Sequence, residues 1–155
     1  MERLWALVER EGIYVKWSDL GRAPEGLRGM YYYDPVVRTP VIVLDRGLAA
    51  RPRELRCVLA EELGHHFTVP QAEAFRTYFS FGNALAQGRD EERAFRWAAA
   101  FLAPDEALRQ ALAEGEDVCG LAERFGVTEA WMRRRLALLA SAPQGTGCGS
   151  GAAGA

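Results

Sequence analysis

The two histidines of the chain, His65 and His66, are adjacent and follow a pair of glutamates, Glu61 and Glu62. The run that contains them, LAEELGHHF at 59–67, predicts a helix, on which residues four apart project from the same side. Glu61 and His65 can therefore reach one cation, and Glu62 lies beside them. In the H-E-x-x-H arrangement of zinc peptidases, the first and fifth residues bind zinc, and the second takes a proton from zinc-bound water.

The chain has E-E-x-x-H in place of this arrangement, and a carboxylate is also a competent zinc ligand. A motif that began at Glu62 would place Leu63 where the base is needed, whereas a motif that begins at Glu61 supplies ligand, base and ligand in order. We therefore predict Glu61 and His65 as metal ligands and Glu62 as the catalytic general base. Gly64 would let a packed neighbour approach this helix closely, at a cost of about 1 kcal/mol relative to alanine.

A catalytic zinc ion normally has three protein ligands, so a third must come from another segment. The best candidate is the run DEERAFRWAAAFLAP at 90–104, in which acidic residues open an apolar helix. Helical periodicity leaves Asp90, Glu91 and Glu92 open as the third ligand. These carboxylates also have an ordinary explanation, because acidic residues in the first turn of a helix interact favourably with its dipole.

These residues must be positioned by a mainly helical chain with a small sheet near its N-terminus. Apolar periodicity predicts helices at 1–11, from 53 through the histidines, and at 71–86, 90–102, 105–114, 117–125 and 128–140. Extended runs at 13–17, 30–33 and 41–44 predict a small antiparallel sheet of about three strands. The last segment, 141–155, has no large apolar side chain, and we expect it to be a disordered tail rich in Gly, Ala and Ser.

The composition is that of one globular domain. The chain has 155 residues, of which 49% are hydrophobic. It contains 19 Lys and Arg and 21 Asp and Glu, so it does not have the excess of basic residues that is typical of a polyanion-binding protein. Three cysteines without C-x-x-C spacing predict reduced thiols in the cytoplasm rather than a disulfide framework. No stretch approaches the roughly 18 apolar residues of a membrane span, so we expect neither secretion nor membrane insertion.

Residues 121–137 have a helix-turn-helix-like spacing, with a turn at Gly126 and Thr128 as the N-cap of the second helix. The three consecutive arginines of this second helix, 133–135, could contact DNA phosphates. Arginines on a surface helix are, however, commonly solvated, and two glutamates lie close by in the sequence. We expect this segment to pack against the catalytic helices, and direct DNA binding is not expected.

Four segments in order resemble the ImmA/IrrE family of metallopeptidases: 40–45, 57–68, 91–104 and 121–128. The resemblance covers most of residues 1–140 and implies a zincin-like α+β fold with the helices of 121–140 packed on it. It matches the third metal ligand to Glu91, six residues before Trp97, and makes Asp90 and Glu92 the second choices. The chain departs from the family at Glu61, where many members have histidine, and the family pattern assigns no role to His66.

The resemblance also implies a function. Members of the family are linked to mobile elements, prophages and stress responses, where they relieve repression by cleaving a helix-turn-helix repressor. The chain is therefore predicted to be a zinc-dependent endopeptidase, with Zn²⁺ held by Glu61, His65 and Glu91 and a regulatory protein as its substrate. The alternative is a catalytically silent anti-repressor or a DNA-contacting regulator that acts by binding alone.

Overall fold

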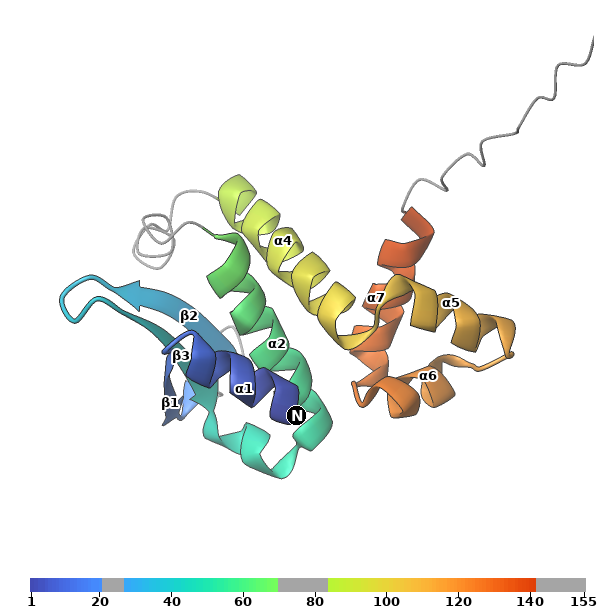
Figure 1. The fold of residues 1–155 in the computed structure, drawn as a ribbon, viewed down its shortest axis with the longest axis horizontal. Coiled ribbons are helices and arrows are strands. Elements are labelled where there is room, and N and C mark those ends of the chain that lie inside the picture. The colour runs from blue at the N-terminus through green and yellow to red at the C-terminus, as the bar shows by residue number, and fades with distance from the viewer. Residues whose placement is uncertain (21–26, 70–83, 142–155) are drawn as a thin grey trace, which may run out of the picture.

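The computed structural model describes residues 1–20, 27–69 and 84–141. In chain order the elements are α1 (Glu2–Arg10), β1 (Tyr14–Ser18), β2 (Gly29–Asp34), β3 (Thr39–Asp45), the 3-10 helix η2 (Arg46–Ala50), α2 (Pro52–Thr68), α4 (Ala84–Leu102), α5 (Asp105–Ala113), α6 (Val118–Phe125) and α7 (Glu129–Ser141). This is the predicted α+β fold. Helices α2 and α4 lie side by side in the middle of the molecule, with the sheet toward one end and α5, α6 and α7 toward the other (Figure 1). Within these described ranges, no helix is both long and apolar enough to cross a membrane.

The three-stranded sheet is mixed, so the prediction of an antiparallel sheet was wrong for one of its two strand pairs. Strands β2 and β3 form an antiparallel hairpin with Tyr31 opposite Ile42, whereas β1 pairs with β3 in parallel with Val15 opposite Ile42. Strand β3 is central, and its residues from Val41 to Asp45 are buried. Because the chain runs back along β2 before it enters β3, strands β1 and β3 point in the same direction. Alternating hydrophobicity reports that a strand exists and does not report its direction.

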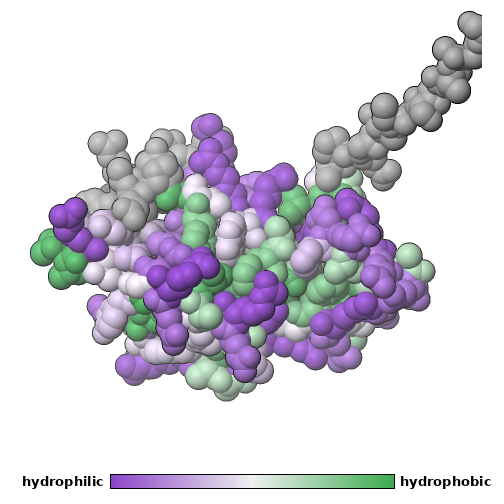
Figure 2. Space-filling model, viewed as in Figure 1, coloured by the Kyte–Doolittle hydropathy of each residue, from purple (hydrophilic) through white to green (hydrophobic). Residues whose placement is uncertain are grey.

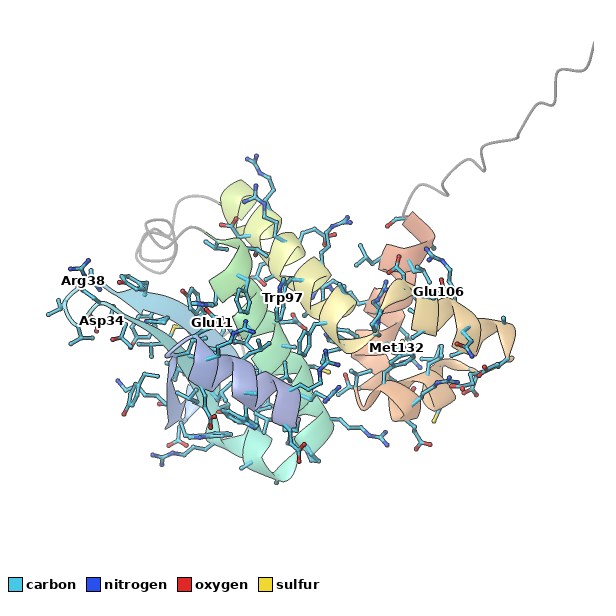
Figure 3. All side chains as sticks on the ribbon, in the orientation of Figure 1. Glu11, Asp34, Arg38, Trp97, Glu106 and Met132 are labelled. Atoms are coloured by element: carbon cyan, nitrogen blue, oxygen red, sulfur yellow. The ribbon has the colours of Figure 1, made fainter. Side chains whose placement is uncertain are left out.

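The β2–β3 hairpin ends in a polar turn that exposes two valines. The Asp34 carboxylate accepts hydrogen bonds from the backbone N–H groups of Val36 and Val37, at 2.9 and 3.2 Å, and Arg38 has a positive φ of 53°. Asp34 and Arg38 mark this turn in Figure 3, and Figure 2 shows an apolar patch at the same end of the molecule. Val36 is 88% exposed and Val37 is 65% exposed.

Helix α4 is longer than predicted at its N-terminal end. It begins at Ala84 and continues through Gly88, whereas the sequence predicted a break there and a helix over 90–102. One glycine costs a helix about 1 kcal/mol relative to alanine, which is less than the burial of the later turns contributes. Most of the predicted helix at 71–86 lies outside the described residues, as does 142–155 of the predicted tail.

Helices α2 and α4 approach each other closely at Gly64. A Cβ atom at this position would lie 2.3 Å from the backbone carbonyl oxygen of Ala94, so residue 64 must lack a side chain. Trp97 lies between the two helices (Figure 3), where its ring stacks on Phe67 of α2 with the ring centroids 4.9 Å apart. The predicted role of Gly64 is confirmed. Around this contact both helices contribute to one buried core, which includes Leu59, Leu63, Phe95, Ala98 and Leu102.

The C-terminal helices join the same core through α7. Met132 is fully buried where the end of α4 meets α7 (Figure 3). Thr128 caps α7 as predicted, because its hydroxyl accepts the backbone N–H of Trp131 at 3.2 Å. Gly126 ends α6 in the left-handed region, with φ 65°. The helix-turn-helix-like segment is therefore present and packs on the rest of the chain.

Arg135 is buried, unlike the solvated arginines that are common on a surface helix. Its side chain is 2% exposed, and its Nε and Nη2 donate to the carbonyl oxygen of Ala103 at 3.0 and 2.9 Å. Asp105 pairs with the same guanidinium. The last carbonyl groups of a helix have no partner within that helix, so a cation at the end of α4 satisfies one of them.

Replacing each of the two glycines of α2 and α4 by alanine should have opposite effects on the free energy of unfolding. Gly64→Ala forces a methyl group against the backbone of α4 and should lower the free energy of unfolding by about 1–3 kcal/mol. Gly88→Ala is the matched control, because a Cβ atom there meets nothing within 4 Å. It should raise the free energy of unfolding by about 0.5–1 kcal/mol. Urea unfolding measures both, and equal stability of the two variants would contradict the contact at Gly64.

Candidate metal centre

His65 of α2 faces Glu91 of α4 beside the close helix contact. The distance between His65 Nε2 and Glu91 Oε1 is 3.4 Å, and the side chains are 17% and 61% exposed. The other two acidic residues of the 90–92 run have different partners: Asp90 pairs with Arg93, and Glu92 pairs with Arg96. Glu91 is thus the member of this run that contacts a histidine.

Glu62 lies beneath this pair, inside the protein. It is 8% exposed, and burial raises the pKa of its carboxyl group to about 8. The charge of His65 lowers this pKa, and the charges of Glu91 and Glu61 raise it. Because burial dominates, the carboxyl group is held close to its point of ionisation at neutral pH.

Strand β2 covers Glu62. A Cβ atom at Gly29 would lie 2.5 Å from Glu62 Oε1 and 2.5 Å from Val58 Cγ1, so the glycine leaves room for the carboxyl group. The backbone of Tyr31, two residues further along β2, hydrogen-bonds to the same carboxyl group and lowers its pKa. Sequence reasoning missed both residues. A glycine at the start of a predicted strand was the available signal for Gly29, because such glycines commonly mark a close approach.

Glu61 is on the same side of α2 as His65, and its carboxylate is bound by α7. Trp131 Nε1 donates to Glu61 Oε1 at 2.9 Å, and Arg134 Nη1 lies 3.3 Å from Glu61 Oε2. Burial raises the pKa of Glu61, while the charge of Arg134 and the hydrogen bond from Trp131 oppose this effect. The predicted first ligand is thus held by the helix-turn-helix-like segment.

The four groups act on one another electrostatically. Burial lowers the pKa of His65, but the hydrogen bond with Glu91 and the charges of Glu62, Glu91 and Glu61 outweigh it, so the net shift is upward. The contact with His65 is the main effect that lowers the pKa of Glu91. Three carboxyl groups therefore act on one imidazole, and of these Glu62 is buried and Glu91 is exposed.

This donor set suits a divalent cation. Zinc accepts imidazole nitrogen and carboxylate oxygen, and two such donors at about 2.1 Å from a tetrahedral ion are about 3.4 Å apart. His65 Nε2 and Glu91 Oε1 have nearly this separation, at 3.4 Å. Over the described residues, no three His, Cys, Asp or Glu side chains form a complete metal-binding group. The carboxylate of Glu61 is bound instead by the two side chains of α7.

His66 belongs to a different contact, between α2, β2 and α1. Its Nδ1 hydrogen-bonds with the Tyr31 hydroxyl at 3.1 Å, and its Nε2 lies 3.7 Å from Glu11 Oε2. Burial lowers the pKa of His66, against the opposing effect of Glu11. His66 thus packs the helix against the strand that covers Glu62.

Glu62 should make the stability of the metal-free protein depend on pH. Burial raises its pKa from the ordinary value of 4.5 to about 8 in the folded chain, so the folded state holds the proton more tightly than the unfolded state. The free energy of unfolding therefore falls as the pH rises from about 4.5 to about 8. Glu62→Gln cannot ionise and should be more stable than wild type at about pH 9, on the order of a few kcal/mol, with little difference at about pH 4. Urea unfolding in the presence of EDTA measures this difference. A difference that does not change with pH would contradict the buried, protonated carboxyl group.

The chain matches a known family model over most of its length. The model describes the IrrE N-terminal-like domain, a peptidase family, and it matches residues 8–137. No curated protein and no solved structure matches significantly. The matched range contains the whole sheet, α2 and α4, and with them every residue of the candidate centre. The chain therefore belongs to the IrrE N-terminal-like family of metallopeptidases, which confirms the ImmA/IrrE membership predicted from the sequence.

Proposed function

We propose that the chain is a zinc-dependent endopeptidase that hydrolyses a peptide bond in a regulatory protein, with Glu61, His65 and Glu91 as metal ligands and Glu62 as general base. The observation that carries this proposal is the His65–Glu91 pair at 3.4 Å beside a buried glutamate, in a chain of a peptidase family. An ordinary surface ion pair would not need a buried carboxyl group next to it.

A zinc ion bound there would polarise the scissile carbonyl group and activate water for attack. Glu62 would accept a proton from the attacking water and return it to the departing amine. This role suits a carboxyl group whose pKa lies near the working pH, because a general base must both take up and release the proton. The backbone of Tyr31 hydrogen-bonds to this carboxyl group, and Gly29 leaves the space that it occupies.

The proposed substrate is a helix-turn-helix repressor of a mobile element, a prophage or a stress response, and this part rests on the family resemblance. A second candidate is a silent anti-repressor that acts by binding alone. It is favoured by the side chains of the described residues, because no three His, Cys, Asp or Glu among them form a complete metal-binding group. Direct contact of the arginine triplet with DNA is not proposed, since Arg133, Arg134 and Arg135 each have an acidic partner.

Adjacent glutamates of α4 provide a test of the ligand set. Wild-type protein should hold about one zinc per chain, and Glu91→Gln should lower the zinc affinity at least about tenfold, because one of three ligands loses its charge. Glu92→Gln removes the neighbouring carboxylate, which pairs with Arg96, and should leave the affinity unchanged. Zinc content after dialysis against a competing chelator distinguishes the variants. Equal zinc content in both would exclude Glu91 as a ligand.

Glu62→Gln separates hydrolysis from binding. The variant keeps the size of the side chain and removes its basic carboxylate, so zinc should stay bound while cleavage of a co-expressed candidate repressor falls by about 10² to 10⁴. His65→Ala should lose the metal itself. Repressor length on gels, the level of repression and metal content are measured together. If Glu62→Gln relieves repression as well as wild type while the repressor stays intact, binding alone explains the function.

A further inference from the structure

We propose that Trp131 and Arg134 of α7 are positioning residues for Glu61, so that the last helix completes the metal centre. This inference rests on the proposed function. It assigns to the helix-turn-helix-like segment a task at the peptidase site itself, in place of a separate role in recognition.

The two contacts fix both oxygens of one carboxylate. Trp131 Nε1 donates to Oε1 at 2.9 Å, and Arg134 Nη1 contacts Oε2 at 3.3 Å. Trp131 is 6% exposed, and a buried indole N–H needs an acceptor, so its contact with Glu61 is costly to break. Each carboxylate oxygen has two lone pairs, so a metal ion and a hydrogen-bond donor can share the group.

Phe95 of α4 holds both positioning side chains in place. The guanidinium carbon of Arg134 lies 3.6 Å from the centroid of the Phe95 ring, and the rings of Phe95 and Trp131 are 5.4 Å apart. Phe95 is on the helix that also carries Glu91, one turn further along. The two α7 side chains are thereby fixed relative to both helices of the site.

Arg134 also balances charge. A glutamate at position 61 adds a negative charge to a site that already contains Glu62 and Glu91, and this charge must be present for the carboxylate to bind a metal ion. The guanidinium of Arg134 lies 3.3 Å from Glu61 Oε2 and offsets part of this negative charge.

The neighbouring arginines of the triplet define the controls. Arg133 pairs with Glu129 on its own helix and is 62% exposed, so Arg133→Gln changes the same residue type without touching the site. Arg135 is unsuitable, because it holds the end of α4. Trp131→Phe keeps the ring packing and removes the N–H donor. Arg134→Lys keeps the charge and loses the planar group.

Cobalt binding provides a readout that does not need catalysis. Co²⁺ affinity is measured by chelator competition, and the visible absorption bands of the ion report the ligand geometry. Trp131→Phe and Arg134→Gln should each weaken binding by about 10- to 100-fold and change the bands, Arg134→Lys should lose less, and Arg133→Gln should match wild type. If Trp131→Phe and Arg134→Gln bind as Arg133→Gln does, or more tightly, the positioning role is excluded.

A metal-free measurement keeps this test independent of the proposed function. The indole N–H resonance of Trp131, identified by its loss in Trp131→Phe, should move in Glu61→Gln and stay in place in Glu92→Gln. If it does not move, Trp131 does not hold Glu61, and the inference fails. If wild-type protein binds neither Co²⁺ nor Zn²⁺, the proposed peptidase function fails, while the indole resonance still decides whether α7 holds Glu61.

Discussion

The close approach of α2 and α4 at Gly64 is the contact on which the rest of the structure depends. A side chain at this position would meet the backbone of Ala94, so the two helices can come this near only because a glycine is present. The contact places His65 on one helix opposite Glu91 on the other. It also buries the apolar faces of both helices in the core that the C-terminal helices share. The same helix contact therefore forms the buried core and brings the His65 and Glu91 side chains together.

The candidate centre combines burial with excess negative charge. Glu62 is buried under β2, where desolvation disfavours its ionised form, and Glu61 and Glu91 add like charges nearby. Such an arrangement disfavours ionisation of Glu61 and Glu62 in the metal-free fold, because burial raises the pKa of both carboxyl groups. A bound cation would relieve both effects at once. A site that is unfavourable without its ligand is typical of functional centres.

Helix α7 connects the helix-turn-helix-like segment to the rest of the protein through four side chains, which make three kinds of contact. Arg135 satisfies the end of α4, Met132 fills the core, and Trp131 and Arg134 bind Glu61. An arginine triplet on a helix is commonly a solvated or phosphate-binding feature. Here its last member is buried and binds the end of α4, and its middle member contacts Glu61 of α2 and the Phe95 ring of α4 from the surface.

The sequence by itself determined that the α-helices of the described residues are present, the number of strands, the family, and the spacing that puts Glu61 and His65 on one side of α2. These features follow from local periodicity and from residue type. It did not determine that β1 and β3 are parallel, that Gly29 admits the carboxyl group of Glu62, or that α7 holds Glu61. Only the tertiary structure decided these features. Periodicity specifies which side of an element is apolar, whereas the partner that meets each polar side chain is set by packing between segments distant in the chain.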